Sequence, residues 1–174
     1  PNAGIIYSKD HGKTWNISTL ARTNTTESQV AEVEPGVLML NMRDNRGGSR
    51  AVSTTTDLGK TWKEHESSRT ALQEPVCMAS LISVKAKENV LGKDILLFSN
   101  PNDAKNRHSI TIKASLDGGV TWLPENQLLL DAGWGWGYSC LTMIDKETVG
   151  ILYESSVAHM TFQAIKLKDI IKTK

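Results

Sequence analysis

An eight-residue pattern that occurs three times constrains the fold of this 174-residue chain more than any other feature. The pattern, S/T-x-D-x-G-x-T-W, occupies residues 8–15, 55–62 and 115–122. Aspartate and glycine two positions apart favour a tight turn, because the carboxylate accepts local backbone hydrogen bonds and glycine adopts positive φ. The hydroxyl residues add local hydrogen bonds, and the tryptophan is expected to anchor the turn against its sheet. The separations between successive repeats, which start at residues 8, 55 and 115, suit four-stranded propeller blades with loops of variable length.

The segments between the repeats have the composition of short β-strands. Residues 109–114 alternate apolar and polar side chains with the period of two that a strand requires. We expect strands at residues 37–42, 94–98, 109–114, 148–153 and 160–165, and one weak helix at residues 167–171. The sequence therefore predicts an all-β fold with many turns.

Composition excludes several functional classes. A net charge of +1, from 20 Lys+Arg and 19 Asp+Glu, does not suit a strongly basic nucleic-acid binder. The chain has no apolar run of about 18 residues, so no membrane span is predicted. No zinc-type cluster of His and Cys is present, and neither a metal nor a cofactor is expected. Cys77 and Cys140 could pair or stay free, and the sequence leaves both open.

The three repeats resemble Asp-boxes, also called bacterial neuraminidase repeats. Families with these boxes carry them on turns at the edge of a β-propeller blade, so a structural role is implied for Asp10, Asp57 and Asp117. Further stretches resemble the C-terminal half of a bacterial exo-α-sialidase, and they are ESQVAEV at 27–33, NMR at 41–43, NRH at 106–108, GYSCL at 137–141 and GILYE at 150–154. The resemblance implies a six-bladed propeller of the sialidase type, of which residues 1–174 would supply about three blades.

Two arginines are the substrate-binding residues that the resemblance implies. Sialic acid carries a carboxylate on its anomeric carbon, and a guanidinium group forms planar, bidentate hydrogen bonds to a carboxylate. Sialidases use three arginines for this purpose, and Arg43 and Arg107 match the second and third. The alternative for each is a surface arginine in a weak ion pair. Arg46 and Arg50 lie outside the motif and are expected at the surface.

The resemblance implies that Tyr138 is the nucleophile and Glu27 its base. A carboxylate nucleophile would be repelled by the substrate carboxylate, whereas a neutral phenol is not. A tyrosine with a pKa near ~10 needs a base beside it, and sialidases depart from the two-carboxylate rule in this way. The alternatives are a packed aromatic for Tyr138 and a solvated charge for Glu27. Glu32 and Glu34 are expected to face solvent.

Residues in and beside the last two of these stretches are expected to support the site or the fold. Glu154 follows an apolar strand, where a charge needs a partner, and by the resemblance it supports the first arginine of the triad. Tyr153 beside it is expected to pack into the blade. Trp134 and Trp136 could line the sugar site or pack over the end of the propeller, and both alternatives are open.

The motif of the first triad arginine, Phe/Tyr-Arg-Ile-Pro, does not occur in this sequence, and in the family it lies in the N-terminal half with the acid/base aspartate. We therefore expect a fragment that is inactive alone and needs the N-terminal half of the same propeller. The implied parent enzyme would be a retaining exo-α-sialidase that acts on sialylated glycans. Its glycan substrates lie outside the cytoplasm, which suggests a secreted or periplasmic location.

Three other functions remain as alternatives at this stage. A non-catalytic Asp-box propeller that binds carbohydrate would explain the boxes equally well. A trans-sialidase would use the same site residues but transfer sialic acid to another sugar. A glycosidase for neutral glycans fits less well, because it would have no use for the arginines.

Overall fold

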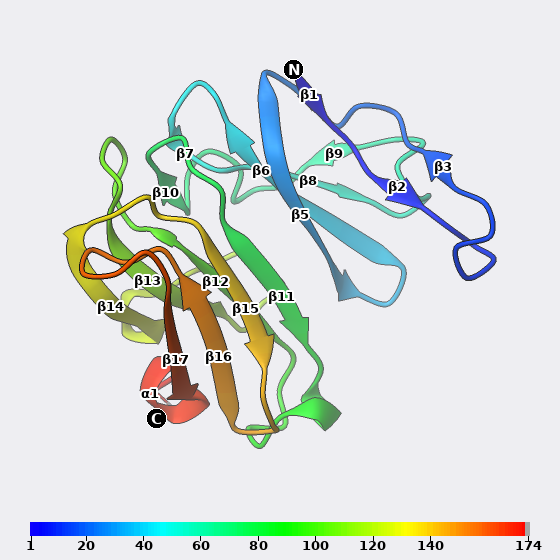
Figure 1. The fold of residues 1–174 in the computed structure, drawn as a ribbon. Helices are drawn as coiled ribbons and strands as arrows, with labels where there is room; N and C mark the ends of the chain where they lie inside the picture. Colours follow the sequence, from blue (N-terminus) through cyan, green and yellow to red (C-terminus); the bar gives the residue numbers. More distant parts are fainter. Residues whose placement is uncertain (173–174) are drawn as a thin grey trace.

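The computed structural model describes residues 1–172 and contains three main antiparallel sheets (Figure 1). In each sheet the strands are paired in chain order, which is the arrangement of a propeller blade. The first sheet consists of β5 (Thr25–Glu34), β6 (Val37–Asp44), β8 (Ala51–Thr55) and β9 (Lys63–Glu64). The second consists of β11 (Ser80–Val84), β12 (Ile95–Pro101), β13 (His108–Ser115) and β14 (Gln127–Trp134). The third consists of β15 (Ser139–Met143), β16 (Thr148–Tyr153) and β17 (Thr161–Lys166).

The remaining elements are short. Three two-stranded pairs join β1 (Asn2–Ala3) to β4 (Arg22–Thr23), β2 (Ile6–Tyr7) to β3 (Asn16–Ile17), and β7 (Gly48–Ser49) to β10 (Gln73–Glu74). Single helical turns are η1 (Ala86–Glu88), η2 (Pro124–Asn126) and α1 (Leu167–Ile170). The all-β prediction is confirmed, and each of the five predicted strands overlaps a strand of the structure. The predicted C-terminal helix is one turn whose residues Leu167 and Ile170 are buried.

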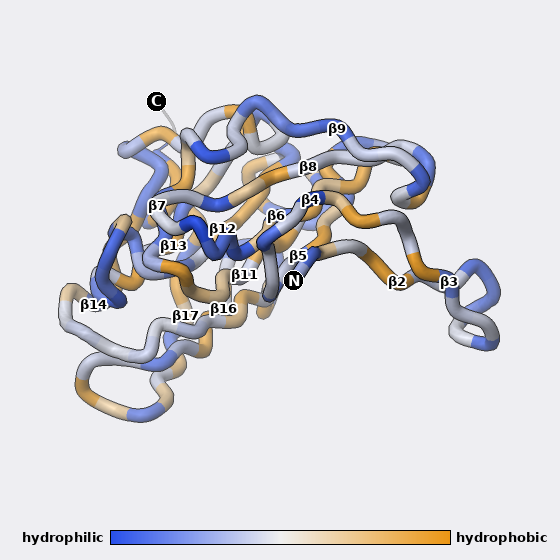
Figure 2. Tube along the Cα trace, turned by 90° about the horizontal axis from the view of Figure 1, so that it is seen from above, coloured by the Kyte–Doolittle hydropathy of each residue, from blue (hydrophilic) through white to orange (hydrophobic). Residues whose placement is uncertain are grey.

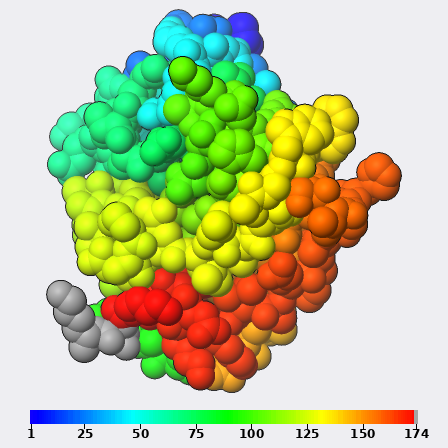
Figure 3. Space-filling model, turned by 90° about the vertical axis from the view of Figure 1, so that its left-hand side faces the viewer, coloured from blue at the N-terminus to red at the C-terminus, as the bar shows by residue number. Residues whose placement is uncertain are grey.

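The first strands of the three sheets, β5, β11 and β15, lie next to one another, and apolar side chains fill the space between adjacent sheets. β12 is buried along its whole length because its two faces serve different clusters. Leu96 and Phe98 pack toward the first sheet, while Leu97 between them packs toward the third. Figure 2 shows hydrophilic stretches such as β9 on the outside of this assembly. In the space-filling view of Figure 3, the N-terminal residues (blue) lie at the top of the molecule and the C-terminal residues (red) at the bottom.

The three repeats form turns with one shared set of hydrogen bonds. In the second repeat, the Thr61 amide donates to Asp57 Oδ1 (3.0 Å) and the Thr61 hydroxyl donates to Asp57 Oδ2 (2.7 Å). Thr55 Oγ1 donates to the same carboxylate and accepts from the Gly59 amide (2.9 Å). Equivalent bonds surround Asp10 and Asp117. The donors on Thr61 lower the pKa of Asp57 to about 2, so the turn requires an ionised carboxylate.

Each repeat joins two antiparallel strands at the outer side of a sheet. The repeats connect β2 to β3, β8 to β9 and β13 to β14, and in the two four-stranded sheets these are the third and fourth strands. The glycine that the three repeats share has positive φ, as the pattern predicts, with 77° at Gly59. The preceding residue also has positive φ, with 58° at both His11 and Leu58, which the pattern did not predict. Two consecutive left-handed residues tighten the turn enough for the aspartate to reach the Thr amide.

The expectation that every repeat tryptophan anchors its turn is wrong for the first repeat. Trp122 is buried and packs edge-on against Phe98, with ring centroids 5.7 Å apart. Trp62 is half-buried and donates to the carbonyl of Thr19 in the preceding segment (3.1 Å). Trp15 is 62% exposed, because no sheet precedes its hairpin among residues 1–172. The burial of the indole thus depends on a neighbouring sheet as well as on its own turn.

Gly59 is predicted to tolerate substitution much less than Gly36, although both have φ near +77°. A Cβ at Gly59 would lie 2.5 Å from Ser18 Cβ and 2.9 Å from Trp62 Cζ2, whereas a Cβ at Gly36 meets nothing within 4 Å. Gly36→Ala should cost about 1–2 kcal/mol from backbone strain alone. Gly59→Ala should cost a further ~1–3 kcal/mol for overpacking. Chemical denaturation of the two variants measures the difference, and equal stabilities would contradict the close packing of this turn.

Candidate active site

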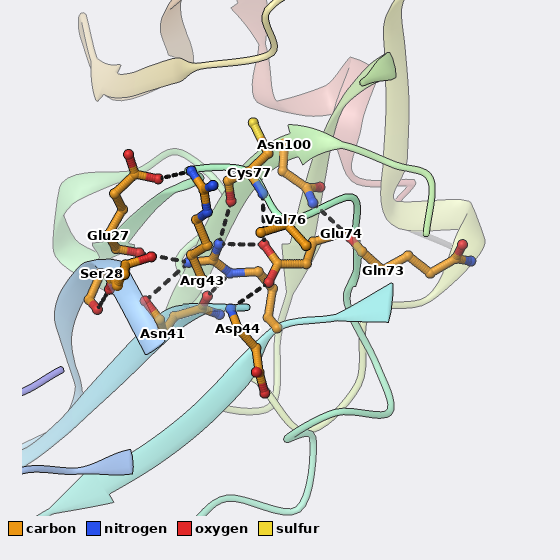
Figure 4. A network of polar contacts seen from close by, with 12 residues as sticks. Glu27, Ser28, Asn41, Arg43, Asp44, Gln73, Glu74, Val76, Cys77 and Asn100 are labelled. Carbon is orange, nitrogen blue, oxygen red and sulfur yellow. Dashed lines mark hydrogen bonds and ion pairs between the residues drawn. The ribbon is translucent and has the colours of Figure 1, made fainter. Parts of the chain in front are cut away.

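The predicted nucleophile and base are in direct contact. The Tyr138 hydroxyl, from the loop before β15, donates a short hydrogen bond to Glu27 Oε1 on β5. Arg43, near the end of β6, donates from Nη1 to Glu27 Oε2 (2.5 Å), and the same nitrogen lies 3.4 Å from the Tyr138 hydroxyl. Figure 4 shows the side chains of Glu27 and Arg43 pointing toward each other. Residues 111 positions apart in the chain therefore form one polar cluster.

A β-bulge places Glu27. Thr25 pairs with Asp44, but Ser28 pairs with Met42, so β5 has one more residue than β6 over this stretch. A bulge of this kind interrupts the ladder and turns a side chain away from the alternation of the strand. The carboxylate of Glu27 reaches Tyr138 and Arg43 from this irregular position.

Arg107 lies over the ring of Tyr138. Its Nη1 donates to the carbonyl of Trp136 (3.0 Å) and its Nη2 donates to the carbonyl of Val76 (3.1 Å). Its guanidinium carbon is 5.8 Å from the centre of the Tyr138 ring, which is a cation–π distance. Carbonyl partners orient the guanidinium but do not neutralise it. Within residues 1–172 no carboxylate is in ion-pair contact with Arg107, so its charge is available to an anion.

The loop before β15 holds Tyr138 by its backbone. Gly137 has φ +88°, and a Cβ there would lie 2.6 Å from Pro101 Cγ, so only glycine fits. The Tyr138 amide donates to Glu154 Oε2 (3.0 Å), and the Glu154 amide donates to the Tyr138 carbonyl (2.9 Å). Glu154 therefore fixes the segment that carries the phenol. Its implied contact with a further arginine stays a prediction. Tyr153 is buried, as expected.

The pKa shifts of the pair match a protonated phenol beside an ionised carboxylate. Partial burial raises the pKa of Glu27, but the hydrogen bonds from Tyr138 and Arg43 outweigh it and leave the pKa below its usual value. The hydrogen bond to Glu27, with partial burial, raises the pKa of Tyr138. Burial also raises the pKa of Cys77, near both arginines, to about 11, so this thiol is protonated at neutral pH. The proton therefore rests on Tyr138 and Glu27 is free to accept it.

The two tryptophans of this loop face solvent. Trp134 and Trp136 are 61% and 60% exposed, with ring centroids 5.6 Å apart and planes tilted by 59°. They line a cavity of about 330 Å³ together with residues 155–159. Both indoles are thus more than half exposed, and Trp136 contributes its backbone carbonyl to Arg107.

The expectation that Arg50 is a surface residue is wrong. Arg50 is fully buried and pairs with the equally buried Glu74 at 2.8 Å. Arg46 agrees with the expectation, since its side chain is 39% exposed, and Glu32 and Glu34 are exposed as predicted. Sequence reasoning missed Arg50 because an arginine between a Gly-Gly-Ser turn and a strand has the context of a surface charge. The one available signal was its position directly before a strand that leads into a repeat.

The described residues contain no disulfide, no metal-binding cluster and no membrane-spanning helix. Both cysteines are free, with Cys77 buried and Cys140 exposed. No group of three or more His, Cys, Asp or Glu side chains within residues 1–172 is arranged to hold a metal ion. No helix among these residues is long and apolar enough to cross a membrane.

Comparisons with known proteins identify the class to which this fold and site belong. The family model described as a BNR repeat-like domain matches residues 1–151. The chain therefore belongs to the BNR repeat-like family. The resemblance to bacterial sialidases that the motifs predicted is confirmed, as is the propeller fold of sialidase type.

Several individual relatives are sialidases, and two of them are bacterial. A sialidase of Bacteroides fragilis is 80% identical over 172 residues, which cover 99% of this chain and 32% of that protein. A sialidase of Micromonospora viridifaciens is 34% identical and aligns with 86% of this chain and 23% of its own length. The structure of Hadza microbial sialidase Hz136 is 75% identical, with a TM-score of 0.95, and the match covers 98% of this chain and 33% of that one. The chain thus spans about a third of the length of the relatives it matches most fully.

Replacing Glu27 by Gln is predicted to lower the pKa of Tyr138. The substitution removes the negative charge that favours the neutral phenol, while the Arg43 charge, which favours the phenolate, stays. Absorbance of tyrosinate, taken as the difference from a matching Tyr138→Phe protein, follows this one phenol. Glu32→Gln is the control, because Glu32 is exposed on the same strand and, in the part of the chain that the structure describes, its carboxylate bonds only to the Gly36 amide. A Tyr138 pKa that is unchanged in Glu27→Gln would contradict the observed pairing.

Proposed function

We propose that this chain is the C-terminal part of a retaining exo-α-sialidase that removes terminal α-linked sialic acids from glycoconjugates. The observation that carries the proposal is the hydrogen bond from Tyr138 to Glu27, flanked by Arg43 and Arg107. A phenol with its own base beside two guanidinium groups suits an anionic sugar better than a neutral one. The 80% identity to a sialidase of Bacteroides fragilis supports the same reaction.

The arginines bind the carboxylate of the substrate in this proposal. Arg43 donates to Glu27 through Nη1, while its Nε is buried and has no acceptor within residues 1–172. Arg107 is oriented by two carbonyls and holds its charge over the phenol ring. An incoming carboxylate would give both guanidinium groups the anionic partner that the free site supplies only through Glu27.

The reaction begins with attack by the Tyr138 oxygen on the anomeric carbon. Glu27 is within hydrogen-bond reach and takes the phenol proton as the new bond forms, while the bond to the leaving oxygen breaks. The transition state has oxocarbenium character and leads to a covalent intermediate on Tyr138. An acid/base residue from outside this chain protonates the leaving oxygen and then activates the water that releases sialic acid with retained configuration. Glu154 holds the Tyr138 segment, because its carboxylate accepts a hydrogen bond from the Tyr138 amide.

We infer that the N-terminal half of the same propeller supplies the missing acid/base residue and the first arginine. Three features support this inference. The chain spans about a third of the relatives it matches, the indole of Trp15 lacks the neighbouring sheet that the other repeats have, and Phe162 and Leu152 are 60% and 41% exposed on the third sheet. This chain alone is then inactive. The glycan substrate implies that the complete protein works outside the cytoplasm or in the periplasm.

The complete protein is expected to release 4-methylumbelliferone from its sialoside, and Tyr138→Phe should reduce kcat at least about a thousandfold. The variant keeps the aromatic ring but has no oxygen to attack the anomeric carbon. Product analysis with lactose as an added acceptor separates hydrolysis from transfer. Wild-type turnover in the variant would rule out Tyr138 as the nucleophile, and sialoside binding without release by the wild type would favour a binding module.

Arg43→Ala is predicted to weaken binding of sialic acid roughly 10- to 100-fold, since hydrogen bonds to charged groups contribute about 1.5–3 kcal/mol. Calorimetry with the complete protein measures this affinity. Arg46→Ala is the matched control, because Arg46 is three residues further along and, among residues 1–172, bonds only to Asp44 and Thr23. Equal affinities for the two variants would exclude Arg43 from the carboxylate site.

A further inference from the structure

A buried ion pair lies beneath the candidate site and has no part in the proposed reaction. Arg50 directly precedes β8 and Glu74 ends β10, and both side chains are fully buried. Ions removed from water are retained only when further hydrogen bonds satisfy them. The partners of this pair therefore indicate what it does.

Apart from its bond to Glu74, the guanidinium group of Arg50 donates to segments that carry or hold a site residue. Nε and Nη2 donate to Asn41 Oδ1 (2.7 Å) and to the Asn41 carbonyl (3.3 Å), two residues before Arg43 on β6. Nη1 donates to the Cys77 carbonyl (2.7 Å), and Nη2 lies 3.5 Å from the carbonyl of Glu27. One guanidinium group thus connects three segments that are far apart in sequence.

Glu74 holds two of the same segments from the other side, as Figure 4 shows. Its Oε1 accepts from the Asp44 amide (2.7 Å), directly after the site arginine of β6. Its Oε2 accepts from the Cys77 amide (3.4 Å). The residue before Cys77 is Val76, whose carbonyl accepts from Arg107 (3.1 Å). The pair therefore fixes the support of Arg107 as well.

The bulge in β5 makes the Glu27 contact informative. Because the ladder with β6 is interrupted between Thr25 and Ser28, strand pairing does not by itself set the position of the backbone at Glu27. Arg50 Nη2 approaches the carbonyl of that residue from the core. A planar, rigid guanidinium suits this task, since its donors point in fixed directions.

We propose that Arg50 and Glu74 form a positioning pair that holds the Glu27 bulge, the Arg43 end of β6 and the loop supporting Arg107 in one arrangement. The inference rests on the proposed sialidase function. The role of the pair is indirect. Arg50 bonds to the backbone at Glu27, and among residues 1–172 neither Arg50 nor Glu74 bonds to the Tyr138 hydroxyl.

Arg50→Lys in the complete protein is the first test, because lysine keeps the charge but loses the planar set of donors. We expect kcat for the 4-methylumbelliferyl sialoside to fall roughly 10- to 100-fold, the range seen when supporting partners of site residues are lost. Leu97→Ala is the control for general destabilisation. Leu97 is fully buried in β12 and belongs to the cluster between the second and third sheets, so its loss should lower Tm and leave kcat unchanged.

A second readout needs no turnover. If Arg50 positions Glu27, the pKa of Tyr138 should move toward its ordinary value in Arg50→Lys and stay raised in Leu97→Ala, measured as tyrosinate absorbance against matching Tyr138→Phe proteins. Glu74→Gln, which keeps the shape of Glu74, replaces Arg50→Lys if that variant does not fold. A fall in Tm with unchanged kcat and unchanged Tyr138 pKa would overturn the proposal. A wild type that releases no product would refute the sialidase function, and the titration would still decide the positioning role.

Discussion

The packing of each sheet against the next is the constraint on which the rest of this structure depends. The apolar clusters draw their members from two neighbouring sheets, so no sheet covers its own apolar faces. β12 illustrates this, since alternate residues along it belong to different clusters. The site inherits its geometry from this packing. Glu27 lies on the first sheet and Tyr138 leads into the third, and they meet because β5, β11 and β15 lie side by side.

Charge is distributed in two layers at the site. In the outer layer, Arg43 and Arg107 share one nearby carboxylate, Glu27, and a net positive charge faces the phenol. In the inner layer, Arg50 and Glu74 neutralise each other completely. An unbalanced charge can stay where solvent or an anionic ligand reaches it, whereas a buried charge requires a partner. This difference explains why Arg43 and Arg107 suit the binding of an anion, whereas the buried pair of Arg50 and Glu74 suits a positioning role.

The accuracy of the sequence-based predictions depended on how local their physical causes are. The strands at residues 37–42 and 109–114 could be predicted, because apolar runs and alternation are visible in a few residues. β5 was not predicted, since most of its residues are polar and its centre contains the site motif. The burial of Arg50 could not be predicted because its partner Glu74 lies 24 positions away in the sequence. Trp15 was misjudged because its packing requires a neighbouring sheet.

The repeat turns are determined locally. An aspartate, a hydroxyl residue and a glycine within eight positions satisfy one another, so the sequence alone was enough to predict a tight turn with local hydrogen bonds to the aspartate and positive φ at the glycine. The types of the site residues were also readable from the motifs. Their assembly was not, because the Tyr138–Glu27 contact closes a loop of 111 residues and depends on the packing of three sheets. The burial of Arg50 and the partial exposure of Arg43 are likewise properties of that packing, since the partner that buries Arg50, Glu74, is distant in the sequence.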